Sequence, residues 1–247
     1  MKMSRRMLTL LVIASLSSLP TLGRAQDDTQ NTTTSDNDQN ATTPDSDTNA
    51  PLKELMLKSD QVTNTVGIVL KKISPGFWAG VYEVTQKSYQ KVMGSNPSAF
   101  QGGDRPVDSV NWNDAMAFCQ KLTEKEQKTG ELPKRFVYAL PTQAQWEQLA
   151  GDTPASDAVM SLSMPRRSST EPAGSLAPNS LGLYDTRGNV MEWCLDPQDK
   201  PYHVLRGGAW DTYIDINARP EFREYSAPDK TKNDYGFRVV LEPKGSQ

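Results

Sequence analysis

The segment Gly182–Asp196 reads GLYDTRGNVMEWCLD and contains the residues whose types and spacing best suit metal chemistry. Asp185, Asn189 and Glu192 offer hard oxygen atoms. Gly188 permits a positive φ, which would turn backbone carbonyls inward. Carboxylates and main-chain carbonyls are the ligands that calcium prefers. The spacing therefore predicts either a calcium site or a tight turn in which Asp185 caps its own backbone and Glu192 pairs with an arginine.

Few other residue combinations in the chain suit catalysis. His203 is the single histidine, which excludes multi-histidine metal sites and argues against a Ser-His-Asp triad. Because it directly precedes an apolar run, we predict a structural role for it. A hydrolase built on paired carboxylates is an alternative to a solvated rim, and its candidate residues are Asp211, Asp215, Glu221 and Glu224.

The two cysteines, Cys119 and Cys194, are candidates for a disulfide. An even count favours pairing in an exported protein, because the compartment is oxidising. The sequence does not give the distance between their Cα atoms, on which pairing depends. The alternative is that each cysteine is a small buried apolar residue, and both interpretations stand.

The first 25 residues have the pattern of a secretory signal peptide. MKMSRR is basic, Met7–Leu16 is a short, mostly apolar run, and Gly23, Arg24 and Ala25 precede an abrupt change to polar sequence. We expect cleavage after Ala25. An uncleaved membrane anchor is the alternative, although the run is shorter than the roughly 20 residues that span a bilayer. The mature protein is therefore expected in the periplasm or outside the cell, with no stable membrane span.

Residues 26–50 consist almost entirely of Asp, Asn, Thr, Gln and Ser and predict a disordered polar linker. Residues 51–247 are then expected to form the folded domain. Cleavage after Ala25 removes four of the 27 Lys and Arg residues and none of the 30 Asp and Glu residues, so the mature charge is about −7. A negative charge of this size argues against a nucleic-acid partner.

The domain sequence alternates short helical patterns with strands and long loops. Three helices are predicted, because polar caps at Thr85, Asn111 and Thr142 precede apolar stripes. Strands are predicted within residues 66–82, 188–194, 203–207 and 236–241. A long loop rich in Ser, Pro, Ala and Asp fills residues 151–178. These proportions predict an α+β fold.

Several separated motifs follow one another in a fixed order. They read EVTQ at 83–86, NPSAF at 96–100, PVDSVNWNDAMAFC at 106–119, ALPTQAQWE at 139–147, GLYDTRGNVMEWCLD at 182–196, LRGGA at 205–209 and GFR at 236–238. Through these motifs, the region from Gly67 to Leu241 resembles the formylglycine-generating enzyme family, also called the sulfatase-modifying factor domain. The resemblance implies the irregular fold related to C-type lectin domains, with a small twisted antiparallel sheet, few short helices and much coil.

The resemblance makes the metal expectations more specific. Relatives bind calcium in the loop that this chain spells DTRGNVME, through side chains matching Asp185 and Glu192 and carbonyls matching Gly188 and Val190. We therefore expect a structural calcium ion that fixes this loop.

Copper is not expected as a cofactor. Family members that make formylglycine bind copper(I) through two cysteines after the Gly-Gly pair, and oxygen then oxidises a substrate cysteine. Copper(I) requires soft thiolate ligands. The positions matching these cysteines are Thr212 and Asn217, and neither is a thiolate.

The segment after the Gly-Gly pair also contains the candidates for a ligand-binding groove, because relatives hold their substrate there. The candidates are Trp210, Asp211, Tyr213, Asp215, Arg219 and Arg223. Aromatic and arginine side chains suit a peptide, a protein or another polar ligand of the cell envelope. The alternative is that Trp210 is a core residue and the others form a solvated edge.

The resulting prediction is an exported domain of this family that acts as a binding or accessory module and not as an oxidase. The alternative is a sulfatase-modifying oxidase that converts a substrate cysteine to formylglycine, or a related enzyme with different catalytic residues. An oxidation assay on a cysteine-containing peptide, with copper and oxygen supplied, distinguishes the two.

Overall fold

The computed structural model describes residues 52–73, 76–151, 154, 156, 158–162, 165–197, 201–214, 217 and 219–246. The predicted signal peptide (1–25) and polar linker (26–50) lie outside the described residues. Within the described part, no helix combines the length and the apolar character needed to cross a membrane.

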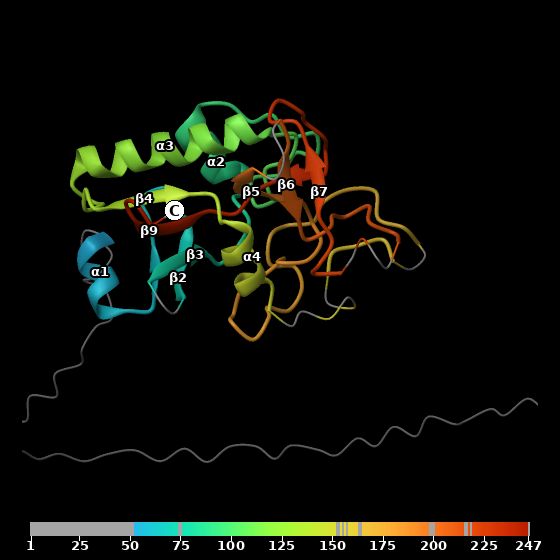
Figure 1. Ribbon diagram of the computed structural model, residues 1–247, viewed down its shortest axis with the longest axis horizontal. Helices are drawn as coiled ribbons and strands as arrows, with labels where there is room; N and C mark the ends of the chain where they lie inside the picture. Colours follow the sequence, from blue (N-terminus) through green and yellow to red (C-terminus); the bar gives the residue numbers. More distant parts are fainter. Residues whose placement is uncertain are drawn as a thin grey trace, which may run out of the picture. The chain divides into compact units, whose positions relative to one another are not determined.

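Two sheets form the framework of the domain (Figure 1). The first has five antiparallel strands in the order β1-β2-β3-β9-β4, with bounds Gln61–Thr63, Val69–Ile73, Phe77–Gly80, Val240–Pro243 and Phe136–Ala139. The second has the order β7-β6-β5-β8, with bounds Glu224–Ser226, His203–Arg206, Met191–Pro197 and Tyr235–Gly236. In the second sheet β5 and β8 run parallel, and the other pairs are antiparallel.

The described residues form four helices, with bounds Leu52–Lys58 (α1), Gln86–Met93 (α2), Trp112–Thr129 (α3) and Gln143–Ala150 (α4). The three predicted caps are confirmed, because Thr85, Asn111 and Thr142 each accept a hydrogen bond from the backbone N–H three residues later. Helix α1 was not predicted, since its seven residues are too few to show a helical period.

Helix α3 packs along the first sheet and supplies much of the main core. Its buried Phe118 meets Tyr89 in a parallel stack and Phe237 edge to face, with centroids 5.6 and 5.3 Å away. The same helix covers the edge strand β4, where Tyr138 N donates to Thr123 Oγ1 at 2.9 Å. The sheet therefore offers no free edge at this position.

The predicted α+β class, with few regular elements and much coil, is confirmed. Two details differ from the sequence-based expectation. The strands divide between two sheets, and the single strand expected at 236–241 is two short strands, β8 and β9, one in each sheet. The residues between them include Arg238, which donates to Glu192 on β5.

The structure does not pair the two candidate cysteines. Cys119 on α3 and Cys194 on β5 are both buried and free. Cys119 belongs to the main core, whereas Cys194 packs with Trp146, Ala150 and Val204 in a separate cluster. Burial raises the pKa of both thiols. Each cysteine therefore acts as a small buried apolar residue, which was the alternative interpretation.

Candidate binding face

The loop leading into β5 is held by the buried side chain of Glu83. Val190 N donates to Glu83 Oε1 at 3.0 Å, and Asn189 Nδ2 donates to Glu83 Oε2 at 2.9 Å. Asn189 has a φ of 61°, and Gly188 has a φ of 85°. A Cβ on Gly188 would lie 2.5 Å from Val159 O, so glycine is required there. A carboxylate more than a hundred residues away in sequence thus fixes this loop.

Glu192 pairs with an arginine, as one of the two sequence interpretations predicted. Arg238 Nη2 lies 2.7 Å from Glu192 Oε1, and both side chains are 1% exposed. Trp146 Nε1 donates to Glu192 Oε2 at 2.9 Å. Arg238 also donates to the carbonyls of Gly80 and Tyr184. The guanidinium therefore links the two sheets and the loop between them.

Asp185 lies in the same buried region. It accepts a hydrogen bond from Gly174 N at 2.6 Å, so it caps an earlier loop instead of its own backbone. Burial raises the pKa of Asp185, and burial together with the charges of Asp185 and Glu192 raises the pKa of Glu83 well above its usual range. Arg238 is the cation that opposes these shifts. The three carboxyl groups of Glu83, Asp185 and Glu192 thus outnumber the one guanidinium that lowers the pKa values of Glu83 and Asp185, and burial favours the neutral form of these two.

This excess bears on the predicted calcium set of Asp185, Glu192 and the carbonyls of Gly188 and Val190. The donor types suit a hard cation, and a cation would lower the electrostatic cost of the buried carboxylates. In the part of the chain that the structure describes, no three or more His, Cys, Asp or Glu side chains lie close enough together to hold a metal ion by themselves. Carbonyls would have to complete the set, and Glu192 would share its oxygen atoms with Arg238.

Trp210 lies at the border between the core and the surface. Its ring meets Phe100 edge to face, with centroids 5.2 Å apart. Its indole Nε1 donates to Asn233 O at 3.2 Å, and its backbone N donates to Asn189 O at 3.0 Å. The side chain packs against the main core and is half-buried. Trp210 is thus firmly positioned while part of it faces solvent.

All the exposed large apolar side chains of the described residues fall between positions 162 and 225. They are Leu162, Tyr202, Tyr213, Ile214 and Tyr225. Tyr213 is 56% exposed, and the guanidinium of Arg166 lies 4.3 Å from the centre of its ring. We call the exposed surface that this stretch of the chain contributes the loop face, and these five residues, Trp210 and Arg166 mark it. Tyrosine, tryptophan and arginine are the residues most enriched at protein interfaces.

A shallow depression of about 590 Å³ borders this face, lined by Arg219, Glu221, Phe222, Arg223 and Tyr225. Arg223 Nη2 lies 2.7 Å from Glu147 Oε1, an oxygen atom that also accepts from the buried Arg206 at 3.1 Å. Arg223 is therefore oriented by α4. Tyr225, which is 51% exposed, leaves its ring open to solvent.

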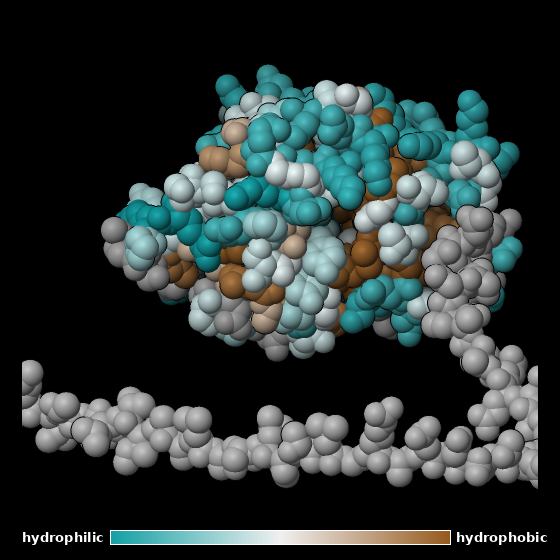
Figure 2. Space-filling model, turned by 180° about the vertical axis from the view of Figure 1, so that it is seen from behind, coloured by the Kyte–Doolittle hydropathy of each residue, from teal (hydrophilic) through white to brown (hydrophobic). Residues whose placement is uncertain are grey.

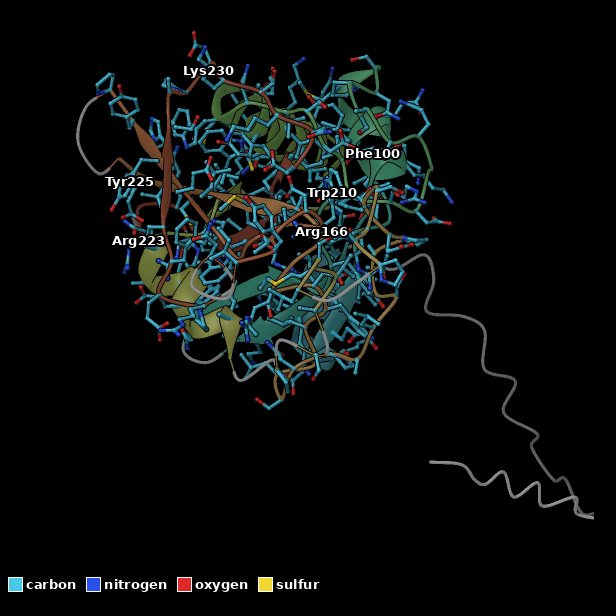
Figure 3. All side chains as sticks on the ribbon, turned by 90° about the vertical axis from the view of Figure 1, so that its right-hand side faces the viewer. Phe100, Arg166, Trp210, Arg223, Tyr225 and Lys230 are labelled. Carbon is cyan, nitrogen blue, oxygen red and sulfur yellow. The ribbon has the colours of Figure 1, made fainter. Side chains whose placement is uncertain are left out.

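The predicted groove residues are distributed over two places. Figure 3 shows Trp210 with Phe100 and Arg166 on one side of the view, and Arg223 with Tyr225 on the other. Asp211, Tyr213 and Arg219 are exposed, and Asp215 lies outside the described residues.

The other residues considered for catalysis take part in structural contacts. His203 stacks on Trp112 with ring centroids 3.9 Å apart. Glu224 pairs with Lys232 at 2.6 Å, and Glu221 lines the depression beside Arg223.

Thr212 and Asn217 converge beside Gly208. A Cβ built on Gly208 would lie 3.2 Å from Thr212 Oγ1 and 3.3 Å from Asn217 O. The structure therefore brings together the two positions that the sequence matched to the copper cysteines. Thr212 Oγ1 accepts a hydrogen bond from Ala209 N at 2.9 Å. The chain's two cysteines lie elsewhere, on α3 and β5.

Sequence analysis assigned no role to Glu83, Arg238, Phe100 or Arg166. Glu83 and Arg238 stand in the EVTQ and GFR motifs. Each of these two motifs has a single charge beside apolar residues in a strand-like segment. This pattern could have indicated a buried polar network. Phe100 and Arg166 reach the loop face through tertiary contacts, and no local pattern indicates such contacts.

Comparisons with known proteins show what this chain is similar to. The chaperone protein LppX of Paenibacillus barcinonensis is 28% identical, over 66% of this chain and 79% of that protein. The formylglycine-generating enzyme of Streptomyces coelicolor is 29% identical, over 56% of this chain and 52% of the enzyme. This chain thus spans about half of that enzyme.

The fold is also found among solved structures. Treponema denticola variable protein 1 superimposes with a TM-score of 0.58 and 25% identity, over 74% of this chain and 94% of that one. The C-type-lectin-like fold that the motifs implied is confirmed. The sulfatase-modifying factor enzyme 1-like domain matches residues 37–243. The chain belongs to this family, which includes the formylglycine-generating enzymes.

Proposed function

We propose that this domain is an exported binding or accessory module that recognises a protein or peptide through its loop face. The observation that carries the proposal is that every exposed large apolar side chain of the described residues lies in the stretch 162–225, which also contains Trp210 and the contact of Arg166 with Tyr213. Exposed apolar clusters rimmed by polar residues are typical of interaction sites. The similarity to a protein named as a chaperone, over most of its length, supports an accessory role.

The residues beside Gly208 support a role other than copper-dependent oxidation. Thr212 presents its hydroxyl, and Asn217 its backbone carbonyl, to this position. Neither residue carries a thiolate, which is the ligand that copper(I) needs. The alternative function, oxidation of a substrate cysteine to formylglycine, is favoured by the similarity to enzymes that carry this name, such as the Streptomyces enzyme.

Capture of partners from a cell-envelope extract tests the proposal. The wild-type domain is compared with a Tyr213→Ser/Tyr225→Ser double variant, and bound proteins are quantified by mass spectrometry. Both tyrosines are more than half exposed, so folding should be unaffected. We expect one set of proteins to lose most of its binding to the variant while Lys121→Ala on α3 keeps it. Equal capture by all three proteins would contradict the assignment of the loop face.

Calcium is proposed as a structural ion of the loop between Asp185 and Glu192. The support is the excess of buried carboxylates around Arg238. Thermal unfolding with about 1 to 5 mM calcium, which is above the dissociation constants of roughly 0.1–1 mM of extracellular sites, should then occur at a higher temperature than in EDTA. Asp185→Asn should remove most of this difference. An identical melting temperature with calcium and with EDTA would exclude the ion.

Export is proposed from the first 25 residues, through a cleavable signal peptide. Mass spectrometry of the protein purified from its native host should then give a mature chain that begins at Gln26. Recovery of the intact N-terminus from the cytosol would contradict this proposal.

A further inference from the structure

We propose a second binding site, for a small ligand with an apolar body and one carboxylate, in a groove at the α1 end of the domain. The groove measures about 440 Å³. We call it the α1 groove, and its apolar lining consists of Met56, Trp78, Pro133 and Phe136. The site lies outside the residues that the proposed function uses.

Three separate elements meet to form this groove. Met56 comes from α1, Trp78 from β3, and Phe136 from the start of β4. Trp78 is 5% exposed and forms the floor, while Met56 and Phe136 are half-buried and form the walls. Because strand pairing fixes Trp78 opposite Leu241, the floor is part of the main core and is rigid. The groove is therefore formed before any ligand arrives.

Charges at the rim select the kind of ligand. Arg135 and Lys72 line the groove, and the guanidinium of Arg135 is held 5.3 Å from the centre of the Phe136 ring. Lys72 makes only a long, exposed contact of 3.8 Å with Asp60, so its ammonium group can turn to a ligand at little cost. Two cations at the edge of an apolar groove attract an anionic head group.

Glu54 limits how much negative charge the groove accepts. This exposed carboxylate lies on α1 and also lines the groove. A ligand with one carboxylate can approach Arg135 and Lys72 while its apolar body covers the walls. A second anionic group would meet Glu54. The volume falls within the roughly 300–1,000 Å³ of small-ligand pockets, whose lining is mostly apolar with a few polar groups that fix orientation.

The α1 groove and the loop face lie at opposite ends of the domain. Figure 1 shows α1 at one end and strands β6 and β7 at the other. Figure 2, seen from behind, shows apolar surface between hydrophilic residues on the half nearer to α1. The two sites are therefore independent, and the failure of either proposal leaves the other intact.

Octanoate is the probe for this site, and octyltrimethylammonium, with the same chain and the opposite charge, is its control. Titration calorimetry and amide chemical shifts are recorded on the domain from Pro51 onward and on the full mature chain. We expect saturable, single-site binding of octanoate, with the largest shifts at Met56 and Phe136. The cationic control should bind at least tenfold more weakly, because the rim repels it.

Two arginine variants provide a matched pair. Arg135 and Arg166 are both exposed and both lie over an aromatic ring. Arg135→Gln should weaken octanoate binding about fivefold, the factor that one exposed ion pair supports. Arg166→Gln should leave it unchanged. Met56→Glu, which adds a negative charge to the groove, should abolish it.

Several results would overturn the proposal. They are the absence of saturable binding, equal affinity for the cationic control, equal losses in the two arginine variants, and shifts centred away from Met56 and Phe136. If Met56→Glu proves unfolded by circular dichroism, the comparison of Arg135→Gln with Arg166→Gln still decides the outcome.

Discussion

The helical part of the domain, residues 52–151, and the loop-rich part, residues 158–234, are ordered by different interactions. In the helical part each predicted cap is satisfied within three residues of chain. The loop-rich part is instead held by buried side chains from outside it, because Asn189 donates to Glu83 and Glu192 pairs with Arg238. All the exposed large apolar side chains of the described residues belong to the second part.

The difference shows how an irregular region can present a defined surface. A few buried charged groups fix its backbone from the inside of the domain. The exposed side chains of the loop face are therefore not needed for folding. Tyr213 and Tyr225 are then free to face solvent. Binding residues on loops that a rigid scaffold positions are a common arrangement. The account therefore predicts large stability effects beneath the loop face and small ones on it.

Arg238→Ala should give the largest effect. The substitution leaves Glu192 buried without its cation. It also removes the guanidinium that lowers the pKa of Glu83 against the effect of burial. We expect a loss of about 3–5 kcal/mol in the free energy of unfolding. Urea denaturation measures this loss, with Lys121→Ala on the exposed side of α3 as the control. A loss below about 1 kcal/mol would mean that the buried pair does not hold the loop-rich part.

Asp234→Asn should change the pH dependence of stability. Burial, followed by the charge of Asp211, raises the pKa of Asp234 to about 6. The folded state thus binds this proton more tightly than the unfolded state, in which the pKa is about 3.9. The contribution of Asp234 to the free energy of unfolding therefore falls as the pH rises from about 4 to about 6.

The variant should therefore be more stable than the wild type by up to about 3 kcal/mol at pH 7, since each pKa unit is worth roughly 1.4 kcal/mol, and equal to it below about pH 4. The difference between the two unfolding curves measures this directly. A difference that does not vary with pH would show that Asp234 titrates normally.

Asn111→Ala should give a local effect in the helical part. Asn111 caps α3 and forms a reciprocal pair with Asp114. The loss should be about 1 kcal/mol, the usual value for a cap. Hydrogen exchange should show faster exchange in the first turn of α3, with no change at Asn189 or Val190. Faster exchange at those two residues would mean that the two parts are not ordered separately.

Tyr213→Ala should give the smallest effect on folding. The side chain is 56% exposed, and its described ring contact is with the exposed Arg166. We expect a change within about 0.5 kcal/mol, measured by thermal unfolding. A loss above about 2 kcal/mol would identify Tyr213 as part of the fold, and the loop face would no longer be a surface free for binding.

The same contrast explains how far sequence alone could lead. Caps at Thr85, Asn111 and Thr142 were readable because capping is a local interaction. The pairing of Glu192 with an arginine was foreseen as one alternative, but the choice of Arg238 depends on the parallel alignment of β5 with β8. Local patterns do not specify that alignment.

The cysteines and the groove show the limits most clearly. The even count suggested a bond between Cys119 and Cys194, yet each fills a different apolar cluster. Trp210 and Arg223 were placed in one groove because relatives hold their substrate in the segment after the Gly-Gly pair. The structure separates them, and Arg223 forms an ion pair with Glu147 on α4.

Copper(I) titration of the mature domain tests the central claim most directly, beside an oxidation assay on a peptide with a sulfatase-type cysteine. A Thr212→Cys/Asn217→Cys variant is the positive control, because both positions converge beside Gly208. The account predicts that the wild type binds no stoichiometric copper and forms no formylglycine, whereas the variant gains copper binding. Tight copper binding with turnover by the wild type would contradict it and identify the domain as an oxidase.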